Sequence, residues 1–119
     1  MGIIITIIAV VFRIATAFYK AEQSKDDLIK YYVSTIRMTA VFLENDEGSF
    51  LGLENHSDIN DIKKSIVDYG GTNFAINVTD DRYCAEVQLK NGNWYCVDID
   101  TAKEFSSNPA CSVNHYSCH

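Results

Sequence analysis

The chain has 119 residues, which is enough for one domain and too few for two. Its net charge of −6 argues against a nucleic-acid-binding protein, because such proteins carry basic patches. Apolar residues make up 47% of the chain and there is one proline, so the composition predicts a folded protein and excludes a disordered one.

The first eighteen residues, MGIIITIIAVVFRIATAF, are nearly all apolar. The run from Gly2 to Phe12 is eleven residues long before Arg13 interrupts it, whereas a bilayer core needs about 20. The helical pattern continues without proline or glycine to Glu47, and Gly48 is the predicted stop. We therefore expect one helix about 60 Å long. Residues 1–18 would be its apolar segment, for a membrane or a filament, and residues 19–119 would form a globular domain.

Beyond residue 18 the helix becomes amphipathic. Apolar and small residues recur at three- and four-residue steps, which places them on one face. The predicted core face consists of Ala21, Leu28, Tyr32, Thr35, Ile36, Thr39 and Leu43. Because such a helix is longer than a hundred-residue domain is wide, we expect half of it to project.

Two other interpretations of the N-terminus stay open. Residues 1–17 form a secretory signal peptide if Ala15, Thr16 and Ala17 are its cleavage site, although no basic segment precedes the apolar run. Gly2 also lies in a match to the N-myristoylation motif, but a cytosolic lipid anchor conflicts with disulfides.

A loop and a short helix follow the long helix. The loop over residues 45–56 carries one apolar anchor, the segment from Phe50 to Leu53. Ser57 and Asp58 are the predicted cap of the short helix, and Gly70 is in its stop signal. The predicted buried face of this helix is Ile59, Ile62, Ile66 and Val67.

Three strand-like runs come next, over residues 73–79, 83–90 and 94–99. Asn91 and Gly92 predict a two-residue hairpin turn between the last two runs. Residues 101–105 predict one helical turn before the tail. Strands that follow helices indicate an α+β fold, in which a small antiparallel sheet packs one face on the second half of the long helix.

This layout resembles a type IV pilin or a type II secretion pseudopilin. The segment from Gly2 to Val11 is similar to the middle of a pilin's apolar helix, and the segment from Tyr83 to Asp98 is similar to a C-terminal hairpin of many pilin-like proteins. The family's processing signal has a basic leader and a glutamate five residues into the mature chain, whereas the first acidic residue here is Glu22. The resemblance therefore implies that about a dozen residues of the mature helix are missing, enough to complete a membrane span.

The four cysteines, Cys84, Cys96, Cys111 and Cys118, all lie in the last third of the chain. An even number behind an export-like apolar segment favours disulfides formed in an oxidising compartment. The resemblance implies a disulfide between Cys111 and Cys118, which would leave Cys84 with Cys96.

The geometry of a regular hairpin argues against a disulfide between Cys84 and Cys96. With a two-residue turn Cys84 faces position 99 and Cys96 faces position 87, so the two cysteines lie on opposite faces and about 10 Å apart along the strands. A disulfide needs Cα atoms within about 7 Å. Pairing of the strand cysteines with Cys111 and Cys118 of the tail is the alternative, and the sequence leaves the connectivity open.

No residues form a convincing catalytic or metal site. Cys111, His115, Cys118 and His119 are zinc-ligand types, but their spacing matches no zinc motif. The segment Asp98-Ile99-Asp100 has a form that binds divalent metals, and a turn cap explains it better. There is no phosphate-binding glycine loop and no nucleophile paired with a histidine. We therefore predict no enzyme, no metal and no cofactor.

The expected function is that of a structural subunit of a type IV pilus-like filament or secretion pseudopilus at the cell surface. The expected partners are copies of the chain, other pilin-like subunits and, before assembly, the inner membrane. Packing in the filament or membrane is assigned to Ile3, Ile4, Ile5, Ile7, Ile8, Val10, Val11 and Phe12. The alternatives are a secreted disulfide-stapled binding module that has lost residues 1–17, and a membrane-tethered domain that does not assemble.

Overall fold

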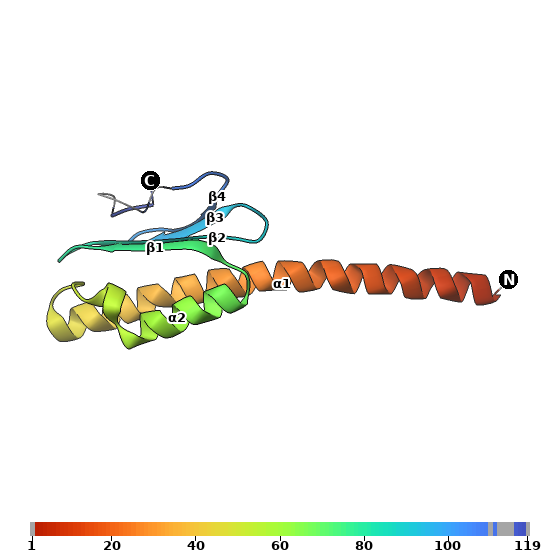
Figure 1. Cartoon of the computed structure of the whole chain (residues 1–119), viewed down its shortest axis with the longest axis horizontal. Coiled ribbons are helices and arrows are strands. Elements are labelled where there is room, and N and C mark those ends of the chain that lie inside the picture. Colours follow the sequence, from red (N-terminus) through yellow and green to blue (C-terminus); the bar gives the residue numbers. More distant parts are fainter. Residues whose placement is uncertain (1, 110, 112–115, 119) are drawn as a thin grey trace.

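A 46-residue helix, α1 (Gly2–Glu47), runs along the whole length of the molecule, and a four-stranded sheet lies across its second half (Figure 1). The computed structural model describes residues 2–109, 111 and 116–118, with the side chains of α1 described from Lys25 onward. The remaining elements are η1 (Leu53–Asn55), α2 (Ser57–Asp68), β1 (Thr72–Val78), β2 (Tyr83–Gln88), β3 (Trp94–Asp98) and β4 (Ala102–Phe105). The architecture is therefore α+β, a helix packed on a small antiparallel sheet.

The sheet is a meander with the order β1-β2-β3-β4, and every neighbouring pair is antiparallel. Its inner face packs on α1 and α2 and includes Tyr83, Ala85, Val87 and Val97, all nearly or fully buried. The three predicted strands are confirmed to within one or two residues of their ends.

The buried face of α1 lies at Ile29, Val33, Ile36 and Ala40, each of which is fully buried. The predicted face is thus displaced by about one residue: Ile36 and Thr39 are buried, but Leu28, Tyr32, Thr35 and Leu43 are only partly buried. The displacement arises because the sheet covers one side of α1 and α2 covers the adjacent side. The predicted stop is confirmed, since Gly48 has φ 72° and its N–H donates to the Glu44 carbonyl at 2.7 Å.

The loop and α2 close the other end of the core. Phe50 and Leu53 are both buried, so the loop supplies two apolar anchors where one was predicted. The cap of α2 is His56, whose Nδ1 accepts from the Asp58 N–H at 3.1 Å, and not the predicted Ser57 and Asp58.

Three of the four residues assigned to the core face of α2 are buried there. They are Ile59, Ile62 and Ile66, and the fourth, Val67, is 65% exposed. Val67 lies about 100° around the helix from Ile66, which turns it away from the core.

Residues 101–105 do not form the predicted helical turn. Most of this segment is β4, which pairs with β3 from Val97 opposite Ala102 to Trp94 opposite Phe105. The turn before it is closed by the Asp98 N–H, which donates to the Thr101 carbonyl at 2.9 Å. The free edge of β3 offers β4 a row of backbone hydrogen bonds, which a single helical turn could not match.

Polar contacts fix the position of α1 on the sheet. The Asp26 carboxylate accepts from the Lys90 N–H at 2.9 Å, and Arg37 donates to the Ile99 carbonyl at 3.2 Å. Lys30 forms an ion pair with Glu104 of β4, which raises the pKa of Lys30 and lowers the pKa of Glu104. The helix therefore contacts both ends of the β2–β3 hairpin and the edge strand, so it cannot slide along the sheet without breaking them.

Candidate functional site

The first half of α1 carries the residues predicted to pack in a filament or membrane. The backbone is helical throughout and extends well past the sheet, so that the molecule measures 70 × 27 × 20 Å (Figure 1). The side chains of the predicted packing residues lie outside the described residues: Ile3, Ile4, Ile5, Ile7, Ile8, Val10, Val11 and Phe12. Among helices with described side chains, none combines the length and the hydropathy needed to cross a bilayer.

The second half of α1 exposes several large apolar side chains on the side away from the core. Tyr31, Met38 and Phe42 are each more than 60% exposed, and Val41 is 52% exposed. These residues were not predicted from the sequence as a surface feature. The spacing of Tyr31, Met38 and Phe42, seven and four residues apart on one helix, is the signal that could have identified them.

The cysteines form two disulfides, which join Cys84 to Cys111 and Cys96 to Cys118. The Cα atoms are 5.8 Å apart in both pairs. The pairing of Cys111 with Cys118 and of Cys84 with Cys96 is therefore wrong, and the alternative pairing of strand cysteines with the tail is confirmed. Each disulfide ties the C-terminal tail to a different one of the two central strands.

The register of the β2–β3 hairpin differs from the one predicted from a two-residue turn. Cys84 faces Asp98, and Glu86 faces Cys96, one residue away from the predicted register. The Gly92 N–H donates to the Leu89 carbonyl at 3.0 Å, and the Leu89 N–H donates to the Asn93 carbonyl at 2.7 Å, so the turn has three residues and not two. A slip of one residue moves a side chain to the other face, which puts both cysteines on the same face.

Two buried carboxylates lie between the disulfides. Glu86 is 1% exposed and Asp98 is 4% exposed, and together with Cys84 and Cys96 they form the outer face of the β2–β3 hairpin, here called the disulfide face. The Cys111 N–H donates to Oε2 of Glu86 at 3.3 Å, and the Cys118 N–H donates to Oδ2 of Asp98 at 2.9 Å.

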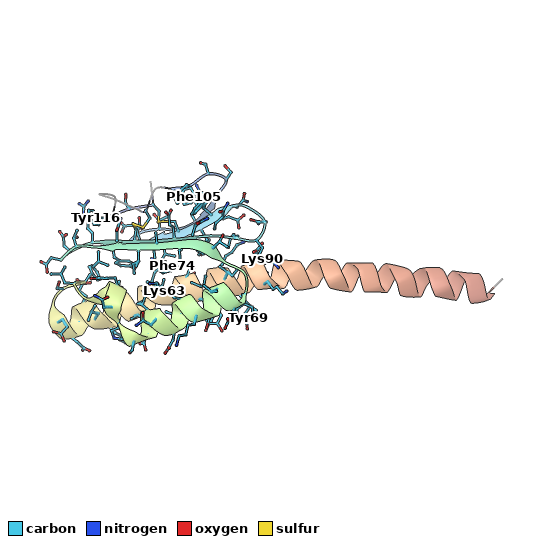
Figure 2. All side chains as sticks on the ribbon, viewed as in Figure 1. Lys63, Tyr69, Phe74, Lys90, Phe105 and Tyr116 are labelled. Carbon is cyan, nitrogen blue, oxygen red and sulfur yellow. A yellow bond between two sulfur atoms is a disulfide. The ribbon has the colours of Figure 1, made fainter. Side chains whose placement is uncertain are left out.

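Each tail cysteine is thus bound twice, once through sulfur and once through its backbone. The sequence carried a signal for this arrangement, because both strands repeat a cysteine followed two residues later by an acid: Cys84 with Glu86 and Cys96 with Asp98. Residues two apart on a strand share a face. Figure 2 shows the disulfide sulfur atoms beside the tail, on the side of the sheet away from the helices, near Phe105 and Tyr116.

The two carboxylates have different surroundings. Oδ1 of Asp98 accepts from the N–H groups of Asp100 and Thr101, which turns this residue into the cap of the β3–β4 turn. Oε2 of Glu86 accepts from the Cys111 N–H. Burial raises the pKa of the Glu86 carboxyl, and this hydrogen bond partly offsets the rise. Glu86 is therefore the less well compensated of the two buried acids.

The residues considered as metal ligands do not come together. Cys111 and Cys118 are consumed by disulfides, and His115 and His119 lie outside the described residues. The segment Asp98-Ile99-Asp100 forms the turn cap just described. Within residues 25–109, 111 and 116–118, no three histidine, cysteine or acidic side chains are grouped to hold a metal ion.

No protein-family model, curated protein or solved structure matches the chain in comparisons with known proteins.

Proposed function

We propose that the chain is a structural subunit of a type IV pilus-like filament or secretion pseudopilus. The observation that carries the proposal is α1, whose second half packs on the sheet while its backbone continues past the domain as a helix (Figure 1). The projecting half contains the apolar run from Gly2 to Phe12. A helix that is apolar on all sides needs apolar neighbours, which the inner membrane supplies before assembly and other subunits supply afterwards.

Two further features support the proposal. The contacts of Asp26, Lys30 and Arg37 with the sheet join the domain to the helix, so that packing of the helices would also arrange the domains. The two disulfides suit a domain that faces an oxidising environment, as the outer layer of a surface filament does. The proposed role is mechanical, and it requires neither catalysis nor a cofactor nor nucleic acid.

The proposal is tested by placing a charge in the apolar half of α1. We expect Ile8→Lys to remove the chain from filaments sheared off cells, because an unpaired ammonium in an apolar bundle costs several kcal/mol. The matched control is Val67→Lys, which places the same charge at an exposed position of α2 and should leave the chain in the filaments. The measurement is the amount of chain in the sheared fraction, by immunoblot and negative-stain microscopy.

Three outcomes would overturn the proposal. Unchanged incorporation of the Ile8→Lys chain would show that the apolar half is not buried between subunits. A mature N-terminus at Phe18, measured by mass spectrometry of the native protein, would favour the secreted binding module. Surface filaments that never contain the chain would favour the membrane-tethered domain.

A further inference from the structure

The outer side of α1 carries a continuous line of uncharged residues opposite the core. Tyr31, Met38 and Phe42 are 63%, 61% and 62% exposed, and Leu28 and Thr35, which lie between them along the same line, are partly exposed. At about 100° per residue this line lies about 150° around the helix from the buried face centred on Ile29 to Ala40. Neither the sheet nor α2 covers it.

The spacing of these five residues alternates between three and four, which is the heptad pattern of a coiled coil. The same steps of three and four continue towards the N-terminus of the sequence through seven further positions. These are Ser24, Ala21, Ala17, Ile14, Val10, Ile7 and Ile3. None of the twelve positions is charged, although α1 contains eleven charged residues. We call this line, from Ile3 to Phe42, the outer seam.

We propose that the outer seam binds the outer seam of a second copy of this chain, with the two α1 helices parallel in a left-handed coiled coil. A repeat of 3.5 residues keeps a seam facing a partner only if the partner is another helix that supercoils with it. Lipid alone sets no such repeat, and it would not extend into the half of α1 that packs on the sheet. A second copy supplies a helix of the same length and the same pattern.

The parallel direction follows from the sequence of α1. In a parallel pair the apolar run from Gly2 to Phe12 lies beside its counterpart, whereas an antiparallel pair would place it against the half that carries Lys25, Asp27 and Glu44. This step rests on the proposed function, in which all subunits point the same way. The proposal adds that the assembly contact extends past the apolar run to Phe42, along the part of α1 that also holds the sheet.

Photo-crosslinking of the full chain in its host tests the seam directly. Benzoylphenylalanine replaces Tyr31 or Phe42 in the seam and, as a control, Val67, which is equally exposed on α2. We expect dimers of the chain from both seam positions at about ten times the yield from position 67, with the crosslinked peptides mapping to α1 of both copies. Equal yields at all three positions, or crosslinks only to lipid or to another protein, would overturn the proposal.

A charge substitution separates the seam from a general loss of folding. We expect Met38→Glu to lower the Phe42 crosslink about tenfold, because the carboxylate would be buried in the seam. Val41→Glu is the matched control: it is 52% exposed on the same helix but off the seam, and should keep the yield within about twofold. Far-ultraviolet circular dichroism should be the same for both variants. Equal loss in both variants would refute the seam.

The outcomes also separate this inference from the proposed function. Filaments that form without crosslinks between α1 helices would overturn the seam and leave the filament proposal standing. Crosslinked dimers in cells whose surface filaments never contain the chain would overturn the filament proposal and support the seam.

Discussion

The order of stability of two double-cysteine variants depends on how the four cysteines pair. Cys84→Ala with Cys111→Ala removes one disulfide and leaves the one between Cys96 and Cys118 intact. Cys84→Ala with Cys96→Ala removes one partner from each bridge and therefore removes both. The two variants make the same number of substitutions, so they differ mainly in the number of loops that stay closed in the unfolded chain.

The expected sizes follow from the lengths of these loops. The two bridges span 27 and 22 residues. Loop-closure entropy gives about 3.5 kcal/mol for the first and about 3.4 kcal/mol for the second. The first variant should therefore lose about 3.5 kcal/mol, and the second about 7 kcal/mol if the two contributions add. A loss of that size is comparable to the whole stability of a domain, so we expect the second variant to be largely unfolded.

The assay is urea unfolding of the full chain in mild detergent, followed by the fluorescence of Trp94, the one tryptophan of the chain. Peptide mapping without reduction should find the bridge between Cys96 and Cys118 in the first variant. If the Cys84→Ala, Cys96→Ala variant is instead the more stable of the two, Cys111 and Cys118 bond to each other and our account of the disulfide face is wrong.

Three further predictions concern the core, the buried acid and the turn. Ile36→Ala should cost about 2–5 kcal/mol because the side chain is fully buried, whereas Val41→Ala, 52% exposed on the same helix and off the outer seam, should cost less than about 0.5 kcal/mol in urea unfolding. Glu86→Gln should raise the unfolding free energy at pH 7 and leave it unchanged below pH 4. The pKa of Glu86 is raised in the folded state, so the folded protein binds a proton there more tightly than the unfolded chain does. The stability of the wild type therefore falls as the pH rises from the unfolded-state pKa through the folded-state pKa. Equal dependence of stability on pH in the wild type and the variant would contradict this. Gly92→Ala should lower stability by about 1 kcal/mol because Gly92 has φ 91°, although no atom lies within 4 Å of the added Cβ. A thermal unfolding scan showing no change would argue against the three-residue turn.

The order and type of most elements could be predicted because their signals are local. Helix α1 has no proline or glycine between Ile3 and Glu47 and ends at Gly48, and Asn91 and Gly92 do lie in a hairpin turn. The α+β class follows from that order alone. The exact rotation of α1 could not be predicted, because it depends on where α2 and the sheet both touch the helix.

The disulfide face was not predicted from the sequence. Whether the chain uses two or three residues at Gly92 is a small local difference, yet it decides whether Cys84 and Cys96 share a face. β4 was missed because its partner, β3, supplies the hydrogen bonds that its short sequence cannot supply itself. The contacts of Glu86 and Asp98 with the tail join residues at least 20 positions apart, beyond the reach of any periodic pattern.

The disulfide between Cys84 and Cys111 also limits how far the chain can stretch. If the protein is pulled at its two ends, the tension passes through the sulfur atoms and bypasses the 27 positions between them. At about 3.4 Å per residue, this bypass shortens the greatest possible extension by about 90 Å. A force spectroscopy trace of the oxidised chain should therefore end about 90 Å sooner than that of the reduced chain. Under load β3 and β4 would stay shielded while α1, α2 and β1 are drawn out first.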